Sequence, residues 1–197
     1  AMNIDHAMAA CVVAGGKRRS SRMSVKNWKD EDIFKFLRCK STDGVNWTTN
    51  ISVEVDDEYI EAHNDPTHVN HQIAVGVHNA VVAGKRLNGE PGLWNRSLSM
   101  KGEREPELIF CPNPCGEIAL FMWENCNLGH INLFFFVGKV RLLKEAFRLM
   151  ARFLLRATFG DMSDPDQKLV VAKNRRIGVG FLGFHNWIAM HGIKYSE

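Results

Sequence analysis

The sequence lacks the features that mark several specialised classes of protein. Its 197 residues contain no run of about eighteen uncharged apolar residues, so we expect no membrane-spanning helix. The first ten residues include Asp5 and lack the basic segment of a secretory signal. No repeat or low-complexity segment occurs, and a composition of 45% hydrophobic residues excludes a disordered chain. We therefore expect a folded globular protein.

The chain also has few cysteines and a small net charge. The chain has five cysteines, an odd number without a secretory signal, which favours a reducing, cytoplasmic compartment over a disulfide-bonded protein. The 25 Lys and Arg residues nearly balance the 22 Asp and Glu residues, and the net charge of +3 is too small to indicate nucleic-acid binding. We expect no direct contact with nucleic acid or with a membrane.

The hydrophobic pattern alternates between strand-like and helix-like segments. Strands are predicted at 9–14, 51–55, 107–111, 130–137 and 177–182. Helices are predicted after a cap at Asp30, from Asp65-Pro66 to a point before Asn88-Gly89, at 139–159, from Asp164-Pro165 to 174 and at 184–190. Strict alternation at 51–55 indicates one solvent-facing side, whereas 130–137 and 177–182 are apolar enough to be buried. This order of elements predicts an α/β layer or barrel with outer helices.

A basic loop after the first predicted strand is the first candidate site. Its residues are Gly15, Gly16, Lys17, Arg18, Arg19 and Ser20. Two glycines allow close approach of the backbone, and cations beside a hydroxyl suit a phosphate group. The segment is not a Walker A loop, because no Ser or Thr follows the lysine. A solvent-exposed basic turn is the alternative interpretation.

The second candidate site is the segment 111–117, with the sequence CPNPCGE. Prolines on both sides of Asn113 would stiffen a turn that presents Asn113, Cys115 and Glu117 together. A thiol, a carboxylate and an amide in one turn can supply nucleophile or hydrogen-atom chemistry, proton transfer and hydroxyl recognition. The segment is therefore a candidate catalytic loop.

Two other interpretations of the cysteines remain open at this point. Cys111, Cys115, Cys126 and His130 have a spacing that suits a zinc site with three cysteines and one histidine. The same cysteines also fit a purely structural role, because free cysteine is among the most buried residue types.

The motifs resemble a known family. Residues 113–117 resemble the finger-loop motif of ribonucleotide reductase catalytic subunits, in the form typical of the adenosylcobalamin-dependent (class II) enzymes. The segment ENCNLG at 124–129 is similar to the block that carries a redox cysteine, and 11–20 is similar to the strand and loop that relay effector identity. The segments 88–95 and 174–180 also resemble family blocks. The resemblance covers nearly the whole chain, from about residue 10 to residue 197.

The resemblance implies a fold and a domain organisation. The family has a ten-stranded α/β barrel made of two five-stranded halves, with the cysteine-bearing finger loop inserted through its centre. Residues 1–197 would be a single, incomplete domain, the central part of that barrel. Family members carry a redox cysteine and half of an effector site upstream of these blocks, and a phosphate-binding turn and a cysteine pair downstream. None of these is found here, so we expect a split gene product or a piece of a larger catalytic chain.

The resemblance also implies a reaction and its residues. Members of the family are oxidoreductases. They replace the 2′-hydroxyl of a ribonucleotide by hydrogen and so supply precursors for DNA replication. Carried over by position, Cys115 would form the thiyl radical, Glu117 would be the general base, Asn113 would hold substrate hydroxyls and Cys126 would be a reducing thiol. The implied cofactor is adenosylcobalamin, with no metal site on the chain's own residues. This interpretation disfavours zinc, because Cys115 and Cys126 must remain free thiols.

The implied partners follow from the same resemblance. They are a ribonucleotide substrate, a deoxynucleotide or ATP effector at residues 15–20, a thioredoxin-like reductant and a complementing reductase chain. Two rival interpretations remain. One is a zinc-stabilised binding module, and the other is an inactive relative that keeps nucleotide binding for regulation.

Overall fold

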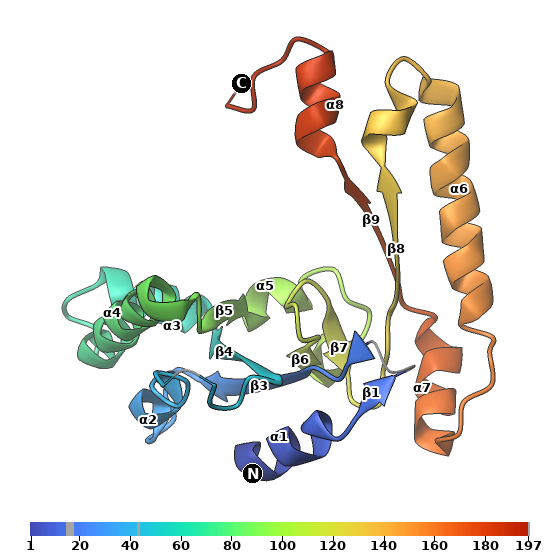
Figure 1. Cartoon of the computed structure of the whole chain (residues 1–197). Helices are drawn as coiled ribbons and strands as arrows, with labels where there is room; N and C mark the ends of the chain where they lie inside the picture. Colours follow the sequence, from blue (N-terminus) through green and yellow to red (C-terminus); the bar gives the residue numbers. More distant parts are fainter. Residues whose placement is uncertain (15–17, 43, 197) are drawn as a thin grey trace. The chain divides into compact units, whose positions relative to one another are not determined.

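The computed structural model describes residues 1–14, 18–42 and 44–196, which form two compact units (Figure 1). The first unit is Ala1–Met122 and the second is Trp123–Glu197. Each unit mixes helices and strands, as an α/β protein requires. Within the described residues the strands form sheets of two or three strands, and none of these sheets closes into a barrel.

The first unit is built on a parallel sheet with the strand order β3-β4-β5. Its strands are β3 (Arg22–Asn27), β4 (Thr49–Val55) and β5 (Gly92–Asn95). The helices of this unit are α1 (Met2–Ala10), α2 (Ile33–Leu37), α3 (Asp57–Asn64), α4 (His71–Asn88) and α5 (Arg96–Met100). Two antiparallel pairs and a short 3-10 helix complete it: β1 (Val13–Ala14) with β2 (Arg18–Arg19), η1 (Pro106–Leu108), and β6 (Ile109–Pro112) with β7 (Ala119–Phe121).

The core of the first unit lies between the sheet and helices α2, α3 and α4. Trp28, Ile33, Val53 and Val77 are completely buried there. The prediction of one solvent-facing side on the strand at 51–55 is wrong. Consecutive residues of β4 are buried because it is the central strand and both its faces are covered. The polar residues Asn50 and Glu54 of β4 are therefore held in fixed positions, and both take part in contacts near the candidate site.

Two helix boundaries in the first unit differ from expectation. The strand predicted at 9–14 is wrong at its start, because α1 continues to Ala10 and only Val13–Ala14 is extended. Asp65-Pro66 does not begin a helix, because the Asp65 carboxylate accepts the Thr67 N–H at 2.8 Å and so caps a separate turn. Helix α4 begins later, at His71, and includes Asn88, one residue beyond the predicted end. Gly89 then stops it in a left-handed conformation with φ 85°.

The second unit pairs β8 (Asn127–Asn132) with β9 (Ile177–Leu182) in parallel. Between them lie η2 (Leu133–Phe136), α6 (Val140–Ala157) and α7 (Pro165–Asn174), and α8 (Phe184–Met190) follows β9. Glycine at position 129 lets α6 approach the sheet, because a Cβ there would collide with the Met150 sulfur. This parallel β–helix–β arrangement is the unit from which α/β sheets are built.

Most of the expectations for the second unit are confirmed. The helices at 139–159 and 164–174 and the elements at 177–182 and 184–190 occur as predicted, and Asp164 caps α7 by accepting the Gln167 N–H at 2.9 Å. The strand predicted at 130–137 is wrong, because the Asn132 side chain accepts the Phe134 N–H and starts a 3-10 turn. Residues Phe181 and Leu182 of β9 are about half exposed, so this strand is not buried as expected.

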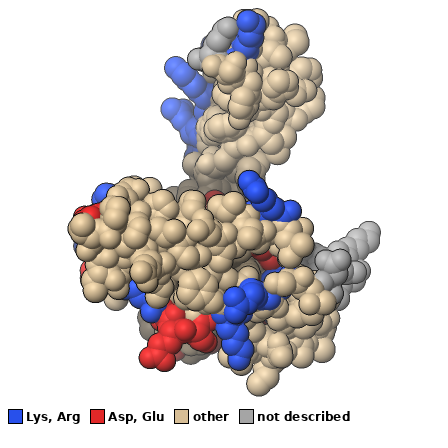
Figure 2. Space-filling model, turned by 90° about the vertical axis from the view of Figure 1, so that its left-hand side faces the viewer, with Lys and Arg blue, Asp and Glu red and all other residues tan. Residues whose placement is uncertain are grey.

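Charged side chains of both signs lie near one another on the first unit. Lys26 pairs with Asp32 at 2.6 Å, and Lys29 pairs with Glu58 at the same distance. Figure 2 shows Asp and Glu side chains gathered beside Lys and Arg side chains, with uncharged residues covering most of the face viewed. None of the helices in the described part of the chain is long and apolar enough to cross a membrane.

Candidate active site

The candidate catalytic loop is the tip of the β6–β7 hairpin. Asn113 follows β6 directly, and its main-chain N–H donates to Ile118 O at 3.0 Å. The Asn113 side-chain oxygen accepts the N–H groups of Gly116 at 3.1 Å and Ile118 at 3.2 Å. Gly116 has φ +86°, a conformation that favours glycine. The amide of Asn113 therefore organises the turn, as asparagine does in tight turns.

The turn presents its reactive groups to the outside. Cys115, Gly116 and Glu117 are exposed, whereas Asn113 and Pro114 are half-buried. The prediction that Asn113, Cys115 and Glu117 share one turn is confirmed in position. Because the Asn113 oxygen is engaged within the turn, its Nδ2 group is the part suited to bind a ligand hydroxyl. The thiol and the carboxylate remain accessible to a substrate.

Three residues that the sequence did not single out anchor this hairpin to the parallel sheet. Asn50 of β4 donates a short hydrogen bond from Nδ2 to the main-chain oxygen of Pro114, the residue before Cys115. Arg96 donates to Ile109 O at 3.2 Å, at the start of β6, and pairs with the Glu54 carboxylate at 3.3 Å. A polar side chain on the apolar strand β4 is the sequence signal that marks Asn50 and Glu54 as candidates.

The fourth predicted catalytic residue lies in the second unit. Cys126 is half-buried and immediately precedes β8, and its Sγ lies 3.7 Å from Asn127 O. The basic loop is only partly described. Gly15, Gly16 and Lys17 lie outside the described residues. Strand β2 consists of Arg18 and Arg19, and the Ser20 N–H donates to Val12 O at 3.2 Å.

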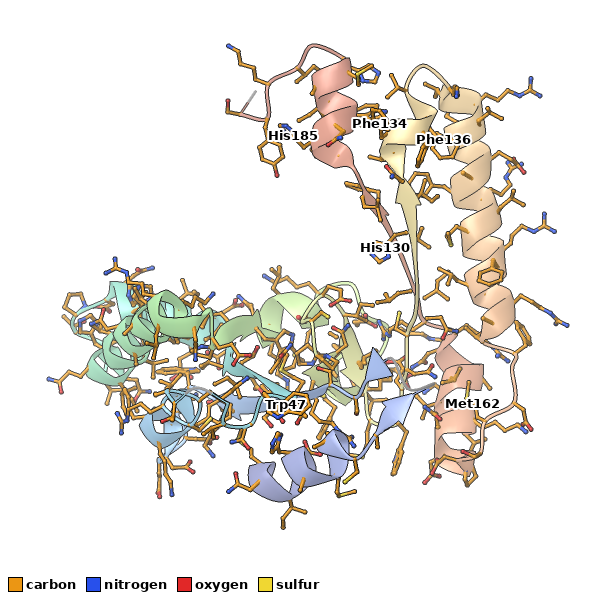
Figure 3. All side chains as sticks on the ribbon, viewed as in Figure 1. Trp47, His130, Phe134, Phe136, Met162 and His185 are labelled. Carbon is orange, nitrogen blue, oxygen red and sulfur yellow. The ribbon has the colours of Figure 1, made fainter. Side chains whose placement is uncertain are left out.

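The four residues of the zinc alternative are divided between the two units. In the described part of the chain, no group of three or more His, Cys, Asp or Glu side chains is arranged to hold a metal ion. Cys111 and Cys115 belong to the first unit, and Cys126 and His130 to the second. The imidazole of His130 lies against Gly180 of β9, on the side of the strand pair away from α6 (Figure 3).

The cysteines of the first unit should differ in reactivity. Burial raises the pKa of the Cys111 thiol and of the Cys39 thiol, whereas Cys115 is exposed. A raised pKa leaves less thiolate at pH 8, and the thiolate is the reactive form. We expect iodoacetamide to alkylate Cys115 faster than Cys111 or Cys39, because the Cys115 thiol is exposed and burial lowers the thiolate fraction of the other two. Peptide mass spectrometry after timed quenching measures the three rates, and equal rates would contradict the exposed position of the Cys115 thiol.

Comparisons with known proteins show which family the chain resembles. Residues 94–197 match the family model of the ribonucleotide reductase barrel domain. The chain is 50% identical over 205 residues to a putative adenosylcobalamin-dependent ribonucleoside-triphosphate reductase of Mycobacterium phage D29, an alignment that covers 100% of this chain and 29% of that protein. It is 31% identical over 197 residues to the adenosylcobalamin-dependent ribonucleoside-triphosphate reductase of Lacticaseibacillus paracasei, covering 95% of this chain and 24% of that one. The chain thus spans less than a third of the length of these relatives.

Two solved structures resemble the fold. A crystal structure of a B12-dependent (class II) ribonucleotide reductase aligns with a TM-score of 0.66 and 28% identity, over 87% of this chain and 23% of that one. The alpha subunit of the Actinobacillus ureae class Id ribonucleotide reductase aligns with a TM-score of 0.71 at 18% identity, over 89% of this chain and 36% of that one. The second likeness concerns the fold alone.

Proposed function

The chain belongs to the ribonucleotide reductase family, and we propose that it supplies the radical-bearing core of an enzyme that reduces ribonucleotides to deoxyribonucleotides. The observation that carries this proposal is the β6–β7 hairpin. It presents an exposed thiol, Cys115, two residues from an exposed carboxylate, Glu117, on a turn that the Asn113 amide holds in shape. A binding module without chemistry has no need of a reactive thiol at such a position.

The residues divide the reaction between them. A thiyl radical on Cys115 takes the 3′-hydrogen atom of the ribose, and Glu117 accepts the proton of the 3′-hydroxyl as general base. Asn113 Nδ2 donates a hydrogen bond to a substrate hydroxyl. The 2′-hydroxyl leaves as water, and two thiols, of which Cys126 is one, supply two electrons and become a disulfide. Cys115 finally returns its hydrogen atom to C3′ and recovers the radical, so the sum is one ribonucleotide and two thiols converted to one deoxyribonucleotide, water and a disulfide.

Adenosylcobalamin is the cofactor that we propose, by analogy with the names of the relatives. The structure suits a cofactor that must reach the sulfur, because Cys115 is exposed at the tip of its turn. When bound, the cofactor supplies the radical. The residues of this chain then hold the substrate, move its proton and keep the radical on one sulfur atom.

The partners that we propose complete this site. The substrate is a ribonucleotide, and the segment 15–20 responds to a deoxynucleotide or ATP effector. A thioredoxin-like protein reduces the disulfide that Cys126 forms, and the cytoplasm keeps the thiols reduced. Because the chain spans 24–29% of its relatives, we infer that the remaining segments of a reductase, in the same polypeptide or in a complementing chain, supply the second thiol and the phosphate site.

A chimera tests the proposed function. The matching stretch of the phage D29 relative is replaced by this chain, and ribonucleoside triphosphate, adenosylcobalamin and a dithiol are added. We expect deoxyribonucleotide formation that depends on the cofactor and on the dithiol, measured by chromatography of the products. A chimera that folds and binds nucleotide but releases no deoxyribonucleotide would instead support the inactive regulatory relative.

A further inference from the structure

A buried carboxylate lies two residues before Cys126. The Glu124 side chain is completely buried, and its Oε2 atom lies 3.0 Å from Arg176 Nε. Its other oxygen, Oε1, accepts a hydrogen bond from Asn174 Nδ2 at 2.8 Å. Both carboxylate oxygens are therefore engaged, as a charge removed from water requires. A buried carboxylate that accepts a hydrogen bond from an amide and pairs with a guanidinium group is well suited to hold a segment in place.

The three residues meet where two strands begin. Glu124 precedes β8, Asn174 ends α7 and Arg176 precedes β9, and the first paired residues of the two strands are Asn127 and Ile177. The cluster thus joins chain segments that are 50 residues apart in sequence at the first rung of the parallel pair.

The turn that carries Arg176 is itself held firmly. Arg175 adopts a left-handed conformation with φ 51° and ends α7 by donating its N–H to Val171 O at 2.9 Å. Its guanidinium group donates to Thr158 O, just beyond the end of α6, and lies 3.9 Å from the centre of the Phe159 ring. Arg176 is therefore presented to Glu124 from a fixed support.

Cys126 lies between two held points. On one side is Glu124, and on the other is Asn127, which is paired with Ile177. Along β8 the side chains alternate: Gly129 faces Met150 of α6, whereas His130 lies against Gly180 on the opposite face (Figure 3). Cys126 is thus the residue next to the first paired residue of β8, and the chain is held on both sides of it.

We propose that Glu124, Asn174 and Arg176 act as a positioning clamp that fixes the segment carrying the Cys126 thiol at the start of the β8–β9 pair. The functional meaning of the clamp rests on the proposed role of Cys126 as a reducing thiol, because such a thiol must point at its substrate. The clamp residues act through Cys126 and do not themselves touch the reacting atoms. A carboxylate that combines a directional hydrogen bond with an ion pair suits this task better than apolar packing, which permits sliding of the strand start.

The test measures the reactivity of Cys126 in the purified chain. Second-order rates of alkylation by iodoacetamide are measured for Cys126 and Cys115 in the same molecules by peptide mass spectrometry. The variant Glu124→Gln keeps the size of the side chain and the bond from Asn174 but loses the charge that holds Arg176. We expect it to raise the Cys126 rate roughly fivefold or more, the factor that corresponds to about 1 kcal/mol of lost local stability, and to leave the Cys115 rate unchanged.

Three further variants complete the experiment. Arg176→Lys keeps the charge and should hold the Cys126 rate within about twofold of the parent, where a 0.4 kcal/mol difference corresponds to this factor. Asn174→Ala removes one of the two bonds and should give an intermediate rate; it also serves as the measurement if Glu124→Gln does not fold. Asp161→Asn, which removes an exposed pair with Lys168 at 3.7 Å, is the matched control and should change nothing.

Two results would overturn the clamp. One is an unchanged Cys126 rate in both Glu124→Gln and Asn174→Ala. The other is an equal rise at Cys126 and Cys115, which would show a general loss of structure. The readout requires no turnover, so an inactive chimera would leave the clamp intact, and an unchanged alkylation rate would leave the proposed reductase function intact.

Discussion

Replacing Cys115 by serine should abolish deoxyribonucleotide formation by the chimera. A hydroxyl group holds its hydrogen atom far more strongly than a thiol does, so serine cannot become the radical that takes the 3′-hydrogen. Loss of the group that forms the reactive intermediate costs roughly 10⁴-fold or more in turnover. The product is measured by chromatography under saturating ribonucleotide, cofactor and dithiol. The structure supports an effect on chemistry rather than on folding, because Cys115 is exposed and the turn is held by Asn113, Gly116 and Ile118.

The matched control is Cys39→Ala. Cys39 is a half-buried thiol of the first unit that packs against its core. This variant should keep turnover within about threefold of the parent, since removing one partly buried sulfur affects mainly stability, by about 1 kcal/mol. Retention of more than a tenth of the turnover by Cys115→Ser would exclude the hairpin as the radical site.

Replacing Trp28 by alanine should destabilise the first unit by about 3–5 kcal/mol, the usual cost of removing a buried Trp side chain. Trp28 has no exposed surface, and its ring lies edge-on to Tyr59 with a centroid distance of 5.4 Å. Its Nε1 also donates to Asp56 Oδ1 at 3.0 Å, and Asp56 caps α3. The variant therefore loses packing and a hydrogen bond together. Urea unfolding of the chain followed by far-ultraviolet circular dichroism measures the change.

Trp47→Ala is the control of the same residue type. Its side chain is 47% exposed, so the same truncation should cost about 1 kcal/mol or less. Equal losses in the two variants would contradict the placement of the core between the sheet and helices α2, α3 and α4. Because this core supports β4, which carries Asn50 and Glu54, its loss should also release the hairpin that these residues anchor.

Local signals predicted much of the second unit. The 3.6-residue period at 139–159 and the Asp164-Pro165 start identified α6 and α7, because a helix is formed by bonds between residues four apart. Local signals failed where two short-range interactions compete. Asp65-Pro66 has the sequence of a helix start, yet the Asp65 side chain caps a separate turn at Thr67. The apolar segment 130–137 divides between β8 and η2 because Asn132 caps the turn between them.

The sequence by itself determined the family and the chemistry-bearing turn. Asn113, Cys115 and Glu117 lie within five residues of one another, so their proximity follows from the chain and from the proline and glycine that shape the turn. Their catalytic roles remain proposals, and the Cys115→Ser variant tests the role of the thiol.

Only the tertiary structure decided which residues support these side chains. Asn50 is 64 residues from Pro114, and Asn174 is 50 residues from Glu124. Such contacts depend on which strands pair and in which register, and a shift of one residue would turn each side chain to the opposite face of its sheet. No local pattern encodes that choice, because it is made by the packing of whole elements. The reactive turn is therefore visible in the sequence, whereas the anchors of the hairpin and the clamp at Cys126 are visible only in the fold.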